Sequence, residues 1–291
     1  WARQFSENAN INDRYYEGDA DKTDLSVFSK ATFKLMENVI GFVDLQGRFV
    51  GYKTNGLNSD RNTFVTDTDF SFFNPKIGLT YKKNDANNFY TSYARANREP
   101  NRDDFEAGIT EHEQLNDIEL GWRYLSDKIS LNSNLYYMFY KNQLVLTGKL
   151  DGVGNPIRAT SGKSYRLGLE MDANIVVSNK FSVQPNIAIS DSKNVDFVKN
   201  VDASNSVIAN TPIAFAPNVV GGNNLIFMPK ENLQFSLLSK YVGKQFLNNI
   251  DDNQSILESY FVNDFNVVYE VTPKSIFKSI VFSGLVNNIF N

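Results

Sequence analysis

The stretch ISLNSNLYYMFYKN, residues 129–142, alternates apolar and polar side chains with a period of two. One set consists of Ile129, Leu131, Leu135, Tyr137 and Phe139, and the opposite set consists of Ser130, Asn132, Asn134 and Tyr136. Since side chains two residues apart share a face of a β-strand, the pattern predicts a strand with one apolar and one polar face. The apolar face could meet lipid or cover a soluble core, and the alternation alone leaves both open.

The same two-residue period recurs along the whole chain and predicts eleven further strands. We expect them over residues 25–35, 39–52, 71–82, 88–97, 115–125, 163–176, 180–191, 217–228, 232–243, 259–271 and 276–287, with a partial strand over 1–6. The connections near 36, 83, 126, 177, 229 and 272 need only about three to five residues. Those beginning near 7, 53, 98, 143, 192 and 244 take roughly fifteen to twenty-five.

Short and long connections therefore alternate, which places all the long ones at one rim of an antiparallel meander. Loops above about twelve to fifteen residues are uncommon in compact domains, so six of them at one end need a common explanation. Outer-membrane β-barrels, with tight periplasmic turns and long external loops, have this arrangement. The rim asymmetry predicts an all-β transmembrane barrel rather than a soluble sandwich.

Aromatic residues are abundant, with 23 Phe, 14 Tyr and 2 Trp, and many stand at the ends of the expected strands. Examples are Phe70, Phe72, Phe73, Phe89, Tyr90, Trp122 and Tyr124. Rings at strand ends are typical of the aromatic girdles of a membrane barrel, although any single ring also suits a core. Nowhere does an apolar run approach the roughly eighteen residues of a transmembrane helix, which excludes a helical membrane protein.

Charge and composition exclude several function classes. A net charge of -4, with no basic stripe, argues against nucleic acid as a partner. The chain has no cysteine and one histidine, His112, which lies between Glu111 and Glu113 in an expected solvated acidic loop. A protein-only zinc site and a Ser-His-Asp triad both lack their usual residues. We therefore expect no catalytic residues, no metal site and no cofactor, and a protein that is not an enzyme.

Three stretches resemble the C-terminal half of the barrel of TonB-dependent outer-membrane receptors, particularly those of the Bacteroidetes. The first is FYTSYARANREPNRDDF, residues 89–105, an aromatic, serine-rich strand that ends in Arg and Pro. The second contains LNDIELGWRY and SLNSNLYYMFYKNQLVLTG, within residues 115–148, and the third is LVNNIFN, residues 285–291. With SYRLGLEMDANI, residues 164–175, the resemblance covers nearly the whole chain.

The resemblance implies a barrel of about twenty-two strands in the outer membrane of a Gram-negative bacterium. Its N-terminal plug domain would be driven by the TonB complex of the inner membrane. Residues 1–291 are expected to form a single barrel segment of about twelve or thirteen strands, with the plug and the final strand absent from this chain. The implied partners are the plug, the remainder of the barrel, the TonB complex through the missing N-terminal region, and membrane lipid or lipopolysaccharide.

The implied function is import of a scarce nutrient: a ferric siderophore first, with haem or cobalamin as further possibilities. Polar groups on a rigid scaffold suit such binding, and arginines suit an anionic metal chelate. The candidate ligand-binding residues are Arg95, Arg98, Asn101, Arg102, Tyr165 and Arg166. For any one of them, a structural role at the plug is the competing interpretation.

Three other functions remain open. A passive porin or a barrel adhesin explains the strand pattern equally well, and a glycan importer of the same superfamily shares the fold. A soluble carbohydrate-binding or hydrolytic β-domain would also alternate apolar and polar residues.

Overall fold

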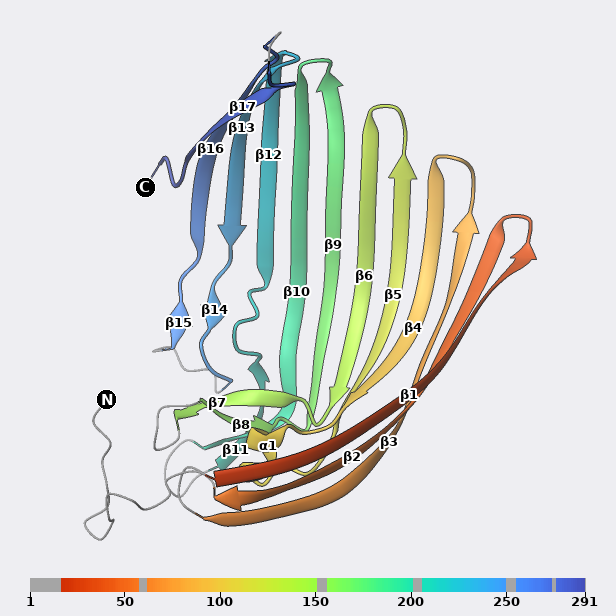
Figure 1. Ribbon diagram of the computed structural model, residues 1–291, viewed down its shortest axis with the longest axis vertical. Helices are drawn as coiled ribbons and strands as arrows, with labels where there is room; N and C mark the ends of the chain where they lie inside the picture. Colours follow the sequence, from red (N-terminus) through yellow and green to blue (C-terminus); the bar gives the residue numbers. More distant parts are fainter. Residues whose placement is uncertain are drawn as a thin grey trace.

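The computed structural model describes residues 17–57, 62–150, 156–200, 206–249, 255–273 and 276–290. One large, curved antiparallel sheet dominates the structure (Figure 1), with its strands in the order β1-β2-β3-β4-β5-β6-β9-β10-β12-β13-β16-β17. The strand β11 pairs with β10, which makes thirteen strands in this sheet. The all-β meander that forms part of a barrel is confirmed.

The strands of the large sheet are β1 (Glu17–Met36), β2 (Val39–Leu57), β3 (Thr63–Lys82), β4 (Asn87–Arg98), β5 (Glu113–Leu125), β6 (Ile129–Lys141), β9 (Lys163–Ser178), β10 (Phe181–Asn200), β11 (Ser206–Pro212), β12 (Val219–Lys230), β13 (Leu233–Val242), β16 (Tyr260–Val271) and β17 (Ile280–Val286). Two small hairpins lie in the long connections: β7 (Leu144–Leu150) with β8 (Pro156–Thr160), and β14 (Gln245–Phe246) with β15 (Ile256–Leu257). The helix α1 (Arg102–Glu106) follows β4, and no described helix has the length and apolarity that crossing a membrane requires.

All twelve expected full-length strands are present, but three expected connection lengths are wrong. β2 continues to Leu57 and β3 begins at Thr63, so only residues 58–62 separate them. β10 likewise continues to Asn200 and pairs with β11, so the long connection expected from 192 is shorter than expected. The short connection expected near 272 is longer than expected, since β16 ends at Val271 and β17 begins at Ile280. The ladders continue where the apolar alternation fades, because backbone pairing does not require a lipid-facing side chain. The partial strand expected over 1–6 lies outside the described residues.

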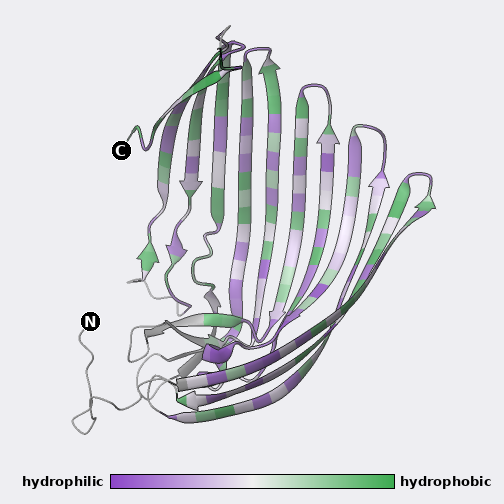
Figure 2. Cartoon of the chain, in the orientation of Figure 1, coloured by the Kyte–Doolittle hydropathy of each residue, from purple (hydrophilic) through white to green (hydrophobic). Residues whose placement is uncertain are grey.

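The register sorts side chains onto two different faces. On one face Asn134 lies opposite Gly121 of β5 and Glu170 of β9, and we call this the lumenal face. On the other, outer face, Leu135 lies opposite Leu120 and Leu169. Apolar and polar bands alternate along the strands (Figure 2). Leu120 and Leu135 remain 51% and 43% exposed, so the outer face covers no protein core and suits lipid.

Aromatic rings form a row on the outer face beside the tight turns, which lie along the upper rim in Figure 1. Phe89 lies with its ring centroid 6.4 Å from those of both Tyr81 and Trp122, and Tyr124 is 6.1 Å from Trp122. The expected girdle is confirmed for these rings. Tyr90, by contrast, is a lumenal residue that donates a hydrogen bond to Asn134 at 3.0 Å.

Three lumenal glycines each lie under an aromatic ring of the neighbouring strand. Gly121 lies directly opposite Tyr90, and a Cβ at this glycine would overlap the Tyr90 ring. Phe42 covers Gly78 and Tyr136 covers Gly168 in the same way. The small residue therefore lets the ring lie flat against the sheet.

We expect Gly121→Val to destabilise the barrel by about 1–3 kcal/mol, the usual effect of overpacking. The Tyr90 ring must move away from the new side chain and loses its hydrogen bond to Asn134. Urea unfolding of the intact protein in detergent measures the change. Gly284→Val is the control, since a Cβ there meets nothing within 4 Å. Equal stability of the Gly121 variant and the parent would contradict the role of the ring.

Candidate functional site

The connection between β4 and β5 folds onto the lumenal face of β1, β2 and β3. Pairing of β4 with β3 stops at Ala94 and Lys76, whereas pairing of β4 with β5 continues to Arg98 and Glu113. The end of β4 therefore parts from β3 and carries the loop of residues 99–112 inward. This inward loop lies at the rim of the long connections, the lower rim in Figure 1.

A short helix shapes the first half of the inward loop. Asn101 caps α1: its side chain accepts a hydrogen bond from the backbone N–H of Asp104, whose carboxylate accepts from the Asn101 N–H, both at 2.9 Å. This reciprocal pair is a capping box with Asp in place of the usual Glu. It fixes where the chain turns, so the next side chains are held in place.

Two side chains of α1 pack against the strands below it. Phe105 is 6% exposed, and its ring stacks on Tyr52 of β2 with the centroids 5.2 Å apart. Arg102 donates from Nη1 to the Thr54 hydroxyl at 2.8 Å and lies 4.7 Å above the Phe64 ring. One apolar and one cationic anchor therefore attach α1 to β2 and β3.

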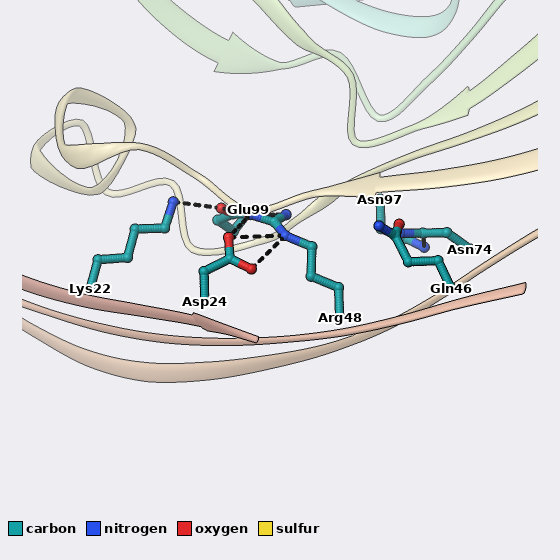
Figure 3. A network of polar contacts seen from close by, with 7 residues as sticks. All are labelled: Lys22, Asp24, Gln46, Arg48, Asn74, Asn97 and Glu99. Carbon is teal, nitrogen blue, oxygen red and sulfur yellow. Dashed lines mark hydrogen bonds and ion pairs between the residues drawn. The ribbon is translucent and has the colours of Figure 1, made fainter. Parts of the chain in front are cut away.

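Four charged residues form a latch at the start of the inward loop (Figure 3), and we call Lys22, Asp24, Arg48 and Glu99 the Glu99 latch. The Glu99 carboxylate accepts from Lys22 Nζ at 2.7 Å and from two Arg48 nitrogens at 2.6 and 2.8 Å. Arg48 also donates to Asp24. The Glu99 side chain is only 6% exposed, so this charge is held away from water and is satisfied by two cations.

A chain of amides fills the gap where β4 leaves β3. Gln114 donates to Asn97 at 3.1 Å, Asn97 donates to Asn74 at 2.8 Å, and Asn74 donates to Gln46 at 3.0 Å. Figure 3 shows the last three of these side chains next to the latch. Together they link β5, β4, β3 and β2 at the base of the inward loop.

The far end of the inward loop is also packed. His112 lies with its ring 5.3 Å from that of Phe72 and 6.4 Å from that of Phe70. Glu111 is exposed, as expected of a solvated loop, but the two rings partly cover the histidine. Among the described residues no group of three or more His, Cys, Asp or Glu side chains is placed to hold a metal ion.

Burial alone raises the pKa of Glu99, but the hydrogen bonds from Arg48 and Lys22 outweigh it and lower the pKa to about 2. Because the folded-state pKa is depressed, the stability from Glu99 is complete above its unfolded pKa of about 4.5 and is lost as the pH falls towards 2. We expect protection of the inward loop from proteolysis to stay constant from pH 8 to about 5 and to fall only below that. Pulses of an acid-tolerant protease measure this, and loss of protection near neutral pH would contradict it.

The structure distributes the six candidate residues over different environments. Arg102 and Asn101 belong to the inward loop, and Arg98 lies opposite Glu113 at its base. Arg95 donates to Asn116 at 3.1 Å on the outer face. Tyr165 is also on the outer face and donates to Asp191 at 2.7 Å.

Arg166 is lumenal, between Met138 and Ser192 in the register, and its buried Nε has no hydrogen-bond partner among the described residues. The six residues do not form one site. Lys22 and Glu99 were not singled out from the sequence, whereas Arg48 falls on the polar face of its strand.

A second set of buried polar groups joins two other long connections on the same rim, those after β10 and β13. Asn194 of β10 is fully buried and donates to Thr211 at 3.2 Å and to Asn249 at 3.3 Å. Asn249 in turn accepts from the backbone N–H of Ala214 at 2.9 Å. These amides attach the connections after β10 and β13 to the sheet. Packed loop segments therefore lie on this rim both near the end of β4 and near the ends of β10 and β13.

An open sheet with an apolar outer face, a polar lumenal face and packed loops at one rim defines the wall of an outer-membrane β-barrel. Residues 2–289 match the family TonB dependent receptor-like, beta-barrel. The chain belongs to this family, whose barrels reside in the outer membrane of Gram-negative bacteria. No curated protein matches the sequence.

Solved structures share the fold at low sequence identity. The siderophore receptor PiuA from Acinetobacter baumannii has a TM-score of 0.69 and 16% identity over 87% of this chain and 37% of its own. The ferric citrate transporter FecA has a TM-score of 0.71 and 16% identity over 98% and 42%. The copper transporter OprC has a TM-score of 0.71 and 14% identity over 94% and 43%. This chain therefore spans about two fifths of these proteins.

Proposed function

We propose that this chain is part of the wall of an energised importer, which binds a scarce nutrient at the loop rim and carries it across the outer membrane. The observation that carries the proposal is the inward loop held by the Glu99 latch. A passive pore needs an open lumen, whereas a loop fastened across the lumenal face of three strands narrows it. Binding and transport, without catalysis, account for this arrangement.

The proposed substrate is a ferric siderophore, with haem and cobalamin as the alternatives to be tested beside it. Arg98, Asn101 and Arg102 at the loop rim, and Arg166 in the lumen, are the proposed contacts for an anionic chelate, since guanidinium groups bind such anions through charge-assisted hydrogen bonds. The names of PiuA and FecA, which concern siderophores and ferric citrate, support the same substrate class.

The proposed partners complete the transporter. The remainder of the barrel would pair with the outer edges of β1 and β17, because an open strand edge is not stable in lipid. A plug domain would fill the lumen, and the TonB complex would act on it through a region N-terminal to this segment. Membrane lipid would cover the outer face.

Deleting the gene is expected to abolish growth when a ferric siderophore is the only iron source, and a plasmid copy is expected to restore it. Haem and limiting cobalamin, supplied in parallel, identify the substrate class. Uptake is also expected to stop when an uncoupler dissipates the proton gradient. Unchanged growth on all three sources would refute the importer, and uptake that continues with the uncoupler would indicate a porin.

A further inference from the structure

A polar row crosses the outer face of β10, β12, β13 and β16, four strands that lie side by side in the sheet (Figure 1). Pro185, Asn223, Ser239 and Asn263 are direct cross-strand neighbours in that order, and we call them the amide row. The adjacent outer-face residues on the last three strands are Leu225, Leu237 and Phe265 on the turn side, and Gly221, Tyr241 and Phe261 on the loop side. The row therefore lies inside the apolar surface and not at its edge.

The hydrogen-bonding groups of the amide row are only partly satisfied within the chain. The Ser239 hydroxyl donates to Asn263 Oδ1 at 2.7 Å. Asn223 Oδ1 is buried and accepts no hydrogen bond in the part of the chain that the structure describes. Acyl chains offer neither donors nor acceptors, and water is excluded at this depth, so an unpaired amide is strongly unfavourable there. The amide row is therefore a poor surface for lipid.

The amide row is also hollow. A Cβ added to Gly221 would meet only the Asn186 carbonyl oxygen, at an ordinary contact distance of 3.6 Å, so no side chain covers this glycine. It differs in this respect from the three lumenal glycines that lie under aromatic rings. Asn263 is 5% exposed, whereas the neighbouring Tyr241 and Phe261 are 39% and 53% exposed. A recessed floor of small and amide residues is thus flanked by exposed rings.

The chemistry of this surface favours a second copy of the same protein as its partner. At this depth a partner has to span the membrane itself. An amide carries both donors and an acceptor, so Asn223 is complementary to its own counterpart across a two-fold axis. The outer-face residues within 181–189, 219–227, 233–241 and 261–271 carry no charge, so two copies do not repel each other. Small residues let two membrane-spanning surfaces approach closely, and exposed rings of one copy can enter the hollow of the other.

We propose that the protein forms a two-fold symmetric dimer in the membrane through the amide row. The Asn223 amides of the two copies turn towards each other and form hydrogen bonds, and the rings beside Gly221 fill the facing hollow. The dimer satisfies amides that lipid leaves unpaired, while lipid covers the rest of the outer face. This interface follows from the wall of the barrel alone and does not depend on which substrate is imported.

Cysteine crosslinking in isolated outer membranes tests the proposal, since this chain contains no cysteine. With Ser239→Cys as the only cysteine of the intact protein, a short bis-maleimide is expected to yield a covalent dimer. Ser133→Cys is the matched control, because Ser133 lies on the outer face of β6, opposite Trp122 and Met171 and away from the amide row. This variant is expected to stay monomeric. Mass spectrometry of the crosslinked product identifies the partner.

Gly221→Val is expected to abolish the crosslink at Ser239→Cys by filling the hollow, and to keep the melting temperature of the parent because its Cβ has room. Gly47→Val is the matched control: this outer-face glycine of β2 lies away from the amide row, and a Cβ there meets only the Phe49 ring, at 3.8 Å. It is expected to keep both the crosslink and the melting temperature.

Asn223→Leu is expected to weaken the dimer about eightfold in sedimentation equilibrium in detergent. This equals ~1.2 kcal/mol, because a hydrogen bond between membrane-embedded side chains contributes ~0.6 kcal/mol and the two-fold axis removes it twice. A monomeric Ser239→Cys variant, equal crosslinking of Ser133→Cys, a crosslinked product that contains a different protein, or an unchanged dimer in both Gly221→Val and Asn223→Leu would each overturn the proposal.

Discussion

Replacing Glu99 by glutamine is expected to release the inward loop from the lumenal face. The amide keeps the shape of the side chain but removes the charge that Lys22 and Arg48 share at 2.6–2.8 Å. Hydrogen bonds to a charged group contribute about 1.5–3 kcal/mol. Lys22 keeps 42% of its side chain exposed and Arg48 keeps its partner Asp24, so neither cation is left buried without compensation. A loss of ~2 kcal/mol raises the open fraction roughly 30-fold.

Limited trypsinolysis of the intact protein measures this release, because Arg102 lies in the loop with a side chain only 17% exposed. Cleavage after Arg102 tracks the open population when opening and closing are fast. Asp67→Asn is the matched control, since it makes the same carboxylate-to-amide change in an exposed pair worth little. If Glu99→Gln and Asp67→Asn are cleaved at the same rate, the latch does not hold the loop.

Releasing the loop also distinguishes two possible roles of the inward loop, which are binding the substrate and narrowing the lumen. For an importer that binds its substrate at the loop rim, the Glu99→Gln variant is expected to bind the ferric siderophore more weakly, because the loop no longer presents Asn101 and Arg102 in one position. If the loop only narrows the lumen, binding is unchanged and leakage of small solutes rises instead. Binding to whole cells and solute leakage, measured on the same variant, separate the two.

The sequence was sufficient for the sheet because alternation is a local property. Each strand that crosses the membrane must put one set of side chains in lipid, so the period of two appears in every one of them. The sequence did not predict that β2 ends at Leu57 and β3 begins at Thr63. Beyond the membrane, lipid no longer requires every second side chain to be apolar. There the ladder from Lys53 and Asp67 to Leu57 and Thr63 is carried by backbone pairing and a polar surface.

The candidate site was less predictable because it depends on contacts distant in sequence. Glu99 is 51 residues from Arg48 and 77 from Lys22, and only the parting of β4 from β3 brings them together. Loop arginines were the sequence-based candidates for binding, and alternation sends Arg95 to the outer face. The capping box of α1 positions Arg102 on the lumenal face. Its residues Asn101 and Asp104 can be read in the sequence, but an Asn followed three residues later by an Asp is too common a pattern to predict a helix.

Phe105→Ala is expected to detach α1 while leaving the Glu99 latch in place. The Phe105 ring is 6% exposed and stacks on Tyr52, and truncating a buried phenylalanine costs about 3–5 kcal/mol. Because the loss falls on a helix of five residues that is too short to be stable alone, the helix is expected to unfold while the sheet stays paired. Hydrogen exchange of the intact protein is then expected to rise over residues 102–108 and to stay low in β2 and β4.

Phe28→Ala provides the control, since the Phe28 side chain is 75% exposed and its loss opens no buried space. If the two contacts act independently, the free-energy losses of the two single variants add up in the double variant. If the two contacts hold the same segment, these losses do not add up. In the double variant Phe105→Ala with Glu99→Gln, the Arg102 cleavage site is already exposed by either single change, since Arg102 belongs to α1. Its cleavage after Arg102 is therefore expected to exceed that of the single variants by much less than the product of their effects. Full additivity would mean that the latch and α1 hold two separate segments of the loop.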